Sequence, residues 1–269
     1  MTPLPTSDPE PAVASSPGGA VCYTDEGPRD APALICLHGV PGSVRDFRYL
    51  APQLAGAVRV IRIDLPGFGC SAVQWEAVDT LQGRGRIALA VADALGIERF
   101  ALAGHSMGGG AALAGAAADP TRVVRLVLLA SMGASRHRGF GPGPRVFGAL
   151  AAAIRWPLAS LLLLPIARGA YRRRRFPGSE TLSAADFALQ FRALAAADFG
   201  LVASLAGSPL PPTLVAFARD DALIEPAVSE DLVARLAGPR VVRFDSGGHN
   251  IQKTRAAELG PEIAAFLTA

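Results

Sequence analysis

The chain has very little lysine. Lys253 is the single lysine among 26 basic residues, so arginine carries almost all of the positive charge, and the formal net charge is only +3. The arginines are scattered except for the run Arg172–Arg175, and no basic stripe is interleaved with aromatic residues. Proteins that bind nucleic acid use such a surface to meet phosphates and bases, so we expect no nucleic-acid partner.

Cysteine is also scarce. The three cysteines, Cys22, Cys36 and Cys70, are odd in number and form no C-x-x-C pair. Cys36 lies in an apolar run, where a free thiol packs as a small hydrophobic group. This pattern predicts a reducing, cytoplasmic setting. The sequence contains neither a metal-binding cluster nor a phosphate-binding glycine loop, so we expect no metal and no cofactor.

The sequence shows no signal peptide and no uninterrupted membrane span. Residues 1–19 are rich in Pro, Ser and Ala without a basic or apolar block, which predicts a disordered tail. Arg155 and two prolines interrupt the apolar stretch 146–167, so its pieces are shorter than the ~20 residues that a bilayer requires. We expect a pair of apolar helices there. An interfacial helix that contacts a membrane surface beside Arg172–Arg175 is the less favoured alternative.

The sequence does contain enough apolar residues for a full core, since they make up half of its 269 positions. Short apolar runs that suit strands buried on both faces alternate with helical stretches. This alternation predicts an α/β fold with a doubly wound, mostly parallel sheet. The expected strands lie at residues 20–23, 33–37, 58–63, 100–103, 123–129, 213–218 and 241–244.

The alternation of strands and helices stops in the segment 134–207, which contains no convincing strand. We therefore expect an α/β core formed by residues 20–133 and 208–269, interrupted by a helical cap over residues 134–207. An insertion at this point lies above the carboxyl ends of the strands, where doubly wound sheets bind their ligands.

The most informative segment is Gly104-His105-Ser106-Met107-Gly108, which joins an expected strand to an expected helix. A strand–G-x-S-x-G–helix arrangement is typical of a nucleophile elbow. This turn is so tight that the residues two before and two after the serine must lack a side chain. The sequence therefore predicts that Ser106 is a nucleophile, with an ordinary glycine-rich turn as the alternative.

A serine hydroxyl needs a base to take its proton and a third group to orient that base. Of the four histidines, His249 follows the last expected strand in a glycine-containing loop, so it is the best candidate for the base. Asp220 and Asp221 follow the preceding expected strand and compete for the role of the acid. Asp221 is favoured because a four-residue turn separates it from the proline that starts the next helix.

Acyl transfer to a serine also requires two N–H donors that hold the oxyanion. The residue after the nucleophile supplies one of them in such elbows, which identifies Met107. A loop that begins at His38 follows another expected strand, and the amide of Val40 in this loop is the expected second donor. A β-turn built on Pro41-Gly42 is compatible with this role.

These segments resemble the α/β-hydrolase superfamily, and more narrowly its cap-bearing, cofactor-independent serine hydrolases. The resemblance covers roughly residues 21–133 and 208–269. It is carried by five separated motifs, namely H-G-V-P-G-S from His38, D-L-P-G-F-G-C-S from Asp64, the G-H-S-M-G elbow, D-A-L-I-E-P from Asp221 and G-G-H ending at His249.

The resemblance implies an α/β-hydrolase fold and a full set of site residues. Ser106 would be the nucleophile, Asp221 the acid and His249 the base, with the oxyanion held by the amides of Val40 and Met107. Serine at the nucleophile position argues against the epoxide-hydrolase and haloalkane-dehalogenase branches, which attack through a carboxylate.

The expected reaction is cleavage of an ester or related carbonyl bond of an apolar small molecule through an acyl-enzyme intermediate. Trp156, Leu162 and Leu163 of the expected cap are candidates for lining an apolar acyl pocket. Two alternatives remain open. One is acyl transfer or another non-hydrolytic use of the same residues, and the other is a binding protein or receptor on a hydrolase fold.

Overall fold

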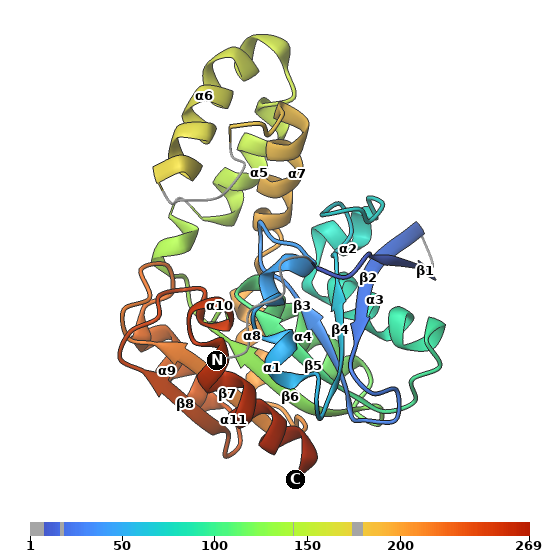
Figure 1. The fold of residues 1–269 in the computed structure, drawn as a ribbon. Coiled ribbons are helices and arrows are strands. Elements are labelled where there is room, and N and C mark those ends of the chain that lie inside the picture. The colour runs from blue at the N-terminus through green and yellow to red at the C-terminus, as the bar shows by residue number, and fades with distance from the viewer. Residues whose placement is uncertain (1–7, 17–18, 142, 174–179) are drawn as a thin grey trace.

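An eight-stranded sheet runs through the residues that this computed structural model describes, which are 8–16, 19–141, 143–173 and 180–269 (Figure 1). The strand order is β1-β2-β4-β3-β5-β6-β7-β8. β1 and β2 are antiparallel to their neighbours, whereas β3 to β8 run parallel, which confirms the predicted sheet. The strands are β1 (Ala12–Ser16), β2 (Gly19–Glu26), β3 (Ala33–Leu37), β4 (Arg59–Ile63), β5 (Phe100–His105), β6 (Val123–Leu129), β7 (Thr213–Ala218) and β8 (Arg240–Phe244).

Successive residues of the parallel strands enter two apolar cores, one on each face of the sheet. Ile35 of β3 packs in the core that holds α3, α4, α8 and α9, whereas Leu34 packs in the core that holds α1 and α11. Helices cover both faces, which explains why the central strands are continuous apolar runs. The helices outside the cap region are η1 (Val44–Phe47), α1 (Ala51–Leu54), α2 (Trp75–Asp79), α3 (Leu81–Ala94), α4 (Met107–Ala118), α9 (Pro226–Arg235), α10 (Ile251–Thr254) and α11 (Ala256–Thr268).

Residues 12–16 do not form the disordered tail that the sequence predicts for residues 1–19. They form β1 on the edge of the sheet, with Ala14 buried. Just before β1, Oδ1 of Asp8 accepts a hydrogen bond from the buried guanidinium of Arg62 at 2.9 Å. The prediction was wrong here because small residues can extend a sheet edge without a strong strand signal. Residues 1–7 and 17–18 of the expected tail lie outside the described residues.

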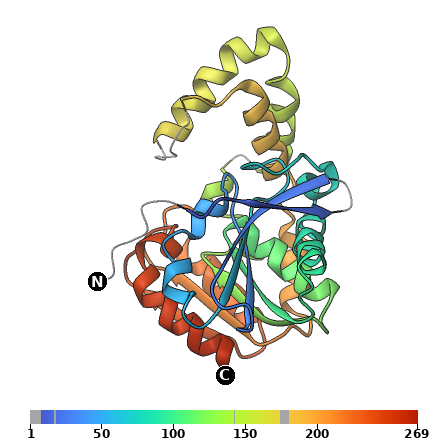
Figure 2. The ribbon, with the colours of Figure 1, turned by 45° about the vertical axis from the view of Figure 1, so that its right-hand side comes forward.

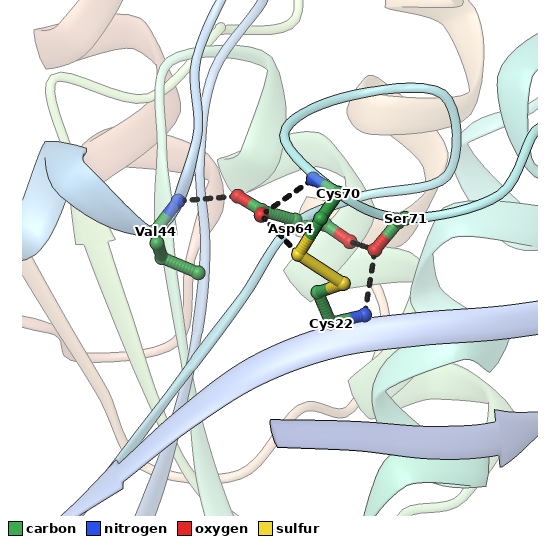
Figure 3. Close-up of a disulfide and its surroundings, with 5 residues drawn as sticks. All are labelled: Cys22, Val44, Asp64, Cys70 and Ser71. Carbon is green, nitrogen blue, oxygen red and sulfur yellow. Dashed lines mark hydrogen bonds between the residues drawn. A yellow bond between two sulfur atoms is a disulfide. The ribbon is translucent and has the colours of Figure 1, made fainter. Parts of the chain in front are cut away.

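Cys22 and Cys70 form a disulfide that joins β2 to the loop after β4 (Figure 3). Asp64 organises the same loop, because its carboxylate accepts hydrogen bonds from the amides of Val44 and Cys70. The hydroxyl of Ser71 bridges the two segments by donating to the Asp64 carbonyl and accepting from the Cys22 amide. The expectation of a reducing compartment was based on unpaired cysteines, so it loses its support.

Between β6 and β7 the described residues form helices, at the place where the sequence predicts a cap. Figures 1 and 2 show α5, α6 and α7 standing away from the sheet as a separate layer. Aromatic contacts hold this layer together, with Phe147 of α5 tilted against Phe191 of α7 and Tyr171 of α6 edge-to-face with Phe187 of α7. The helices are η2 (Arg138–Phe140), α5 (Pro144–Ala153), α6 (Pro157–Arg173), α7 (Ala184–Ala195) and α8 (Phe199–Ala206).

The last helix of the expected cap, α8, belongs to the core instead. It packs on α4 and α9, and its residues Val202 and Ala206 are buried in the core beneath the sheet. The cap therefore ends near Asp198, which caps α8, rather than at residue 207. Sequence periodicity could not separate α7 from α8, since both are rich in alanine and leucine.

Apolar helices raise the question of a membrane span. Within the described residues, no single helix is both long enough and apolar enough to cross a bilayer. One pair, α7 with α8, meets the length and composition criteria when taken together, with a bend of 44° between the two helices.

The helix that follows Ser106 is held close to its neighbour by glycine. A Cβ atom added to Gly85 of α3 would lie 2.6 Å from the backbone nitrogen of Gly115 in α4. Real Cβ contacts are not that short, so any larger residue would push α4 away from α3. The position of α4, and with it that of Ser106, therefore depends on this contact.

We expect Gly85→Ala to lower the free energy of unfolding by about 2 kcal/mol, because the added methyl group overpacks the α3–α4 contact. Gly169→Ala is the matched control, since a Cβ atom at Gly169 in α6 would meet nothing within 4 Å. This control should raise stability by up to about 1 kcal/mol through helix propensity alone. Urea unfolding of both variants measures the difference, and equal stabilities would contradict the prediction.

Candidate active site

Ser106 occupies the tight turn between β5 and α4. Its backbone has φ 55° and ψ −123°, a conformation that residues with a side chain rarely adopt. Backbone hydrogen bonds hold this turn in place, since the Ser106 amide donates to Leu129 and the Ser106 carbonyl accepts from Gly109 and Met132. The surrounding structure thus maintains a strained residue at the carboxyl edge of the sheet.

The two glycines that flank Ser106 are needed for space. A Cβ atom on Gly104 would lie 2.2 Å from the carbonyl oxygen of Gly108, and one on Gly108 would lie 2.2 Å from the carbonyl oxygen of Leu37. Strand, helix and the loop after β3 therefore meet with their backbones in contact. This geometry is the tight strand–turn–helix arrangement that the sequence predicts.

Asp221 and His249 come together from the ends of β7 and β8. Nδ1 of His249 lies 2.8 Å from Oδ2 of Asp221, and the other carboxylate oxygen accepts hydrogen bonds from the amides of Leu223 and Ile224. Burial raises the pKa of the Asp221 carboxyl, but the hydrogen bonds from His249 and from the two amides outweigh burial and leave this pKa below its ordinary value. Asp221 is therefore an ionised, fixed acceptor for the imidazole N–H.

Asp220 has a different partner. Its Oδ1 accepts a hydrogen bond of 2.7 Å from the amide of Gly248, a residue with φ 65° in the loop that carries His249. Of the two competing carboxylates, the structure joins Asp221 to the imidazole and Asp220 to the loop backbone. Asp245, at the end of β8, is exposed and lies 3.6 Å from Arg219.

His105, the residue before Ser106, ties the elbow to the loop of His249. Its Nε2 donates to the carbonyl oxygen of His249 at 2.9 Å, and the two rings lie 4.9 Å apart. The loop that carries His249 is thereby tied to the residue that precedes Ser106. Within the described residues the Ser106 hydroxyl makes no hydrogen bond, either to the His249 imidazole or to another group.

The loop after β3 lies against the same serine. A Cβ atom on Gly39 would be 2.9 Å from Cβ of Ser106, so the backbone of this loop passes directly over the elbow. Buried His38 fixes the loop, since its Nδ1 donates to the Gly39 carbonyl and its Nε2 accepts from the Leu65 amide. The following residue is Val40, and in the described part of the chain its amide donates no hydrogen bond.

Met107 begins α4 with its side chain buried. Its amide is one of the first-turn N–H groups that an α-helix leaves without an intrahelical acceptor. Anions are stabilised at this end of a helix by such free N–H groups and by the helix dipole. The two expected oxyanion donors therefore come from segments that both contact Ser106.

Sequence reasoning missed two positioning contacts. His105 and His38 are both buried; Nε2 of His105 ties the end of β5 to the loop of His249, and the two ring nitrogens of His38 join the loops after β3 and β4. A third contact is the ion pair between Lys253 of α10 and Asp46 of η1 at 2.7 Å. These pairings join segments far apart in the chain, so only the histidine immediately before the serine could have been singled out from sequence.

The cap residues expected to line a pocket differ in their exposure. Trp156 and Leu162 are 72% and 73% exposed, whereas Leu163 is half-buried and packs into the cap. Leu162 and Leu163 differ because successive helical positions point in different directions, and the face of α6 opposite Ala167 is turned outward. The lining of an acyl pocket by these cap residues stays a prediction. A hollow of about 430 Å³ where α2 and α3 meet the α7–α8 junction includes neither Ser106 nor His249.

The described residues hold no group of three or more His, Cys, Asp or Glu side chains that could ligate a metal. The side chains and amides of the site have chemistry of their own. A carboxylate-held imidazole can accept a proton, a strained serine can present its hydroxyl, and free amides can bind a negatively charged oxygen.

Known proteins resemble this chain over most of its length. A family model described as "Alpha/beta hydrolase family" matches residues 34–260. The 2-hydroxy-6-oxononadienedioate/2-hydroxy-6-oxononatrienedioate hydrolase of Cupriavidus pinatubonensis is 31% identical, with 88% of this chain and 87% of that protein covered. The dihydrolipoyllysine-residue acetyltransferase component of the acetoin cleaving system of Pseudomonas putida is also 31% identical, with 96% of this chain and 70% of that protein covered.

Solved structures show the same architecture. The enol-lactonase from Burkholderia xenovorans LB400 superposes with a TM-score of 0.75 at 25% identity, with 96% of this chain and all of that chain covered. Since the match covers nearly all of both chains, the overall fold is shared.

Protonation of His105 should couple folding to pH. Burial, reinforced by the neighbouring His249, lowers the pKa of His105 from the ordinary value of 6.5 to about 3. The unfolded chain therefore binds a proton that the folded chain excludes between these values. The contribution to stability is complete above about pH 6.5 and is lost as the pH falls toward 3.

We expect His105→Gln to flatten the fall in unfolding free energy between about pH 7 and pH 5, because this variant has no ring to titrate. Urea unfolding at several pH values measures the slope. The exposed Arg99→Gln variant is the control and should keep the slope of the parent protein. Parallel curves for His105→Gln and the parent would contradict the prediction.

Proposed function

The chain belongs to the alpha/beta hydrolase family, and within it we propose a serine hydrolase that cleaves an ester or related carbonyl bond of an apolar small molecule. The observation that carries this proposal is the hydrogen bond between His249 and Asp221, at the same edge of the parallel sheet as a serine with φ 55° at a helix N-terminus. The relatives support carbonyl chemistry in general, since their names include a hydrolase and an enol-lactonase.

The first half of the reaction transfers the acyl group to Ser106. His249 Nε2 takes the hydroxyl proton while Oγ bonds to the substrate carbonyl carbon, and the carbonyl electron pair moves to oxygen. Asp221 accepts the Nδ1–H of the imidazole and stabilises its positive charge. The tetrahedral adduct then expels the leaving alcohol, which receives its proton from Nε2.

The negative oxygen of this adduct would lie between the amides of Val40 and Met107. Removing one such donor typically costs 10²–10³-fold in rate, because the donors are fixed before the charge develops. His38 has a positioning role here, since its two ring nitrogens fix the loop that carries the Val40 amide.

The second half of the reaction releases the acid. Water gives a proton to His249 Nε2 and attacks the acyl carbon, and the Ser106 oxygen leaves with the proton that the imidazole returns. The apolar class of substrate is suggested by the cap, where residues 146–167 carry a single charged side chain, Arg155.

Acyl transfer to an acceptor other than water is the second candidate. It is favoured by one observation, the 31% identity over 96% of this chain to an acetyltransferase component. Supplying an alcohol acceptor together with an ester substrate separates the two reactions, since a transferase forms the new ester in preference to the free acid.

Ser106→Ala should abolish labelling by a fluorophosphonate probe and lower ester hydrolysis by roughly 10⁴-fold or more, because no other group can form the acyl-enzyme. Ser131→Ala is the matched control, since Ser131 is a buried serine beside α4. This control should label like the parent protein. Equal labelling of folded Ser106→Ala, or no labelling of the folded parent, would exclude Ser106 as the nucleophile.

Asp221→Asn should lower kcat by roughly 10⁴-fold with little loss of fold, because an amide at this position favours the wrong imidazole tautomer. Asp220→Asn tests the neighbour, which bonds only to loop backbone, and should cost far less. Steady-state hydrolysis of one ester by both variants measures the difference. If Asp220→Asn is the crippled variant, the acid is Asp220.

A further inference from the structure

The outward face of α6 carries an uncovered row of large apolar side chains. Leu158, Leu161, Leu162 and Ile166 are each between 67% and 82% exposed, and Trp156 just before the helix is exposed to a similar degree. Their spacing of three, four and eight residues from Leu158 places the helical members on one face. These five residues are called the outer stripe below.

The outer stripe is not the face by which α6 packs into the cap. The opposite side of α6 is already packed, with Ala167 buried and with Leu163 and Leu164 against the apolar core of the cap. Helix α6 contacts α7 through this inner side, where Tyr171 lies edge-to-face with Phe187. The helix therefore has two apolar faces, and only one of them has a partner within the described residues. Exposing so many large apolar side chains together is costly in water, so such a patch marks an interaction surface.

Positive charge surrounds the outer stripe. Arg155 precedes it, and exposed Arg172 and Arg173 continue the same side of α6 at the last turn. Residues 134–182 contain nine arginines and a single acidic residue, Glu180, so this segment has a net charge of +8. The chain as a whole has +3, which leaves −5 for all other residues. The partner of the stripe must therefore combine an apolar interior with negative charge at its edge.

We propose that the outer stripe and its flanking arginines bind the surface of an anionic lipid bilayer, with α6 lying in the plane of the interface. Leucine and isoleucine would enter the acyl boundary while the guanidinium groups meet lipid phosphates. Tryptophan and arginine at the ends of the apolar row are the residues that favour the headgroup region of a membrane.

A second copy of the chain fits this surface less well. Two caps facing each other through the stripe would bring exposed Arg155, Arg172 and Arg173 of both copies together, so like charges would oppose the apolar attraction. The other alternative is that the cap closes so that the outer stripe covers the α/β domain. Such a closure would remove Trp156, Arg172 and Arg173 from water and bury them against protein. An anionic bilayer instead leaves each arginine beside a phosphate and water. The surface does not involve the Ser106 hydroxyl, so bilayer binding is independent of the proposed catalysis.

The experiment is flotation of the full chain with two kinds of vesicle, phosphatidylcholine alone and phosphatidylcholine mixed with phosphatidylglycerol. We expect the protein to float only with the anionic vesicles and to dissociate as salt is raised. In a Trp75→Phe background, Trp156 is the single remaining tryptophan, and its emission should shift to the blue on anionic vesicles only.

Substitutions then test the apolar side chains and the arginines separately. Leu158→Ser/Leu161→Ser/Leu162→Ser should weaken partitioning roughly a hundredfold, since three apolar contacts are lost. Its matched control is Val13→Ser/Val73→Ser, which changes two exposed apolar residues outside the cap and should bind vesicles like the parent protein. Arg172→Glu should weaken binding about fivefold or more, whereas Arg99→Glu should have a much smaller effect. Ser106→Ala should bind like the parent protein.

Three results would overturn the proposal. They are equal or absent flotation with both vesicle types, normal binding by the folded triple serine variant, and a dimer in sedimentation that the triple variant dissociates. The last result would assign the outer stripe to self-association. Normal binding by the triple variant, with an altered preference for ester chain length, would assign it to closure over the core.

Discussion

Backbone contact around Ser106 is the constraint on which the rest of this structure depends. Gly104 and Gly108 allow β5 and α4 to touch, and Gly108 also lies against the end of β3. The positive φ of Ser106 costs free energy, yet three backbone hydrogen bonds to the ends of β6 and α4 maintain it. A side chain at either glycine would separate the strand, the helix and the loop, and the serine would lose its defined place at the sheet edge.

The parallel sheet brings residues that are distant in the sequence to one edge, and this convergence could be predicted from the sequence. Parallel strands end at the same edge, so Ser106 after β5, Asp221 after β7 and His249 after β8 had to converge. The choice between Asp220 and Asp221 could not be made with the same force, because neighbours on a turn have similar surroundings. Their hydrogen bonds distinguish them, since one accepts from the Gly248 amide and the other from the His249 ring.

Contacts that depend on the assembled fold could not be predicted from the sequence. His105 holds the loop of His249, and Cys22 meets Cys70 because β2 pairs with β4, yet neither pair has a local signal. The burial of individual cap residues could not be predicted for a related reason. Composition shows that α6 is apolar, but only packing on α7 decides which of its two apolar faces is covered, and it leaves Leu162 outside and Leu163 inside.

The cap and the core are joined firmly at one end of α7. The buried guanidinium of Arg84 in α3 donates to the carbonyl of Ala193, and Arg192 forms an ion pair with Asp79 at 2.5 Å. Burial lowers the pKa of Arg84 to about 10, so the group stays charged at neutral pH and its bond to the cap remains charge-assisted. Helix α6 packs on α7 and stands away from the sheet (Figures 1 and 2), so a partner on its outer face would contact the cap and not the elbow.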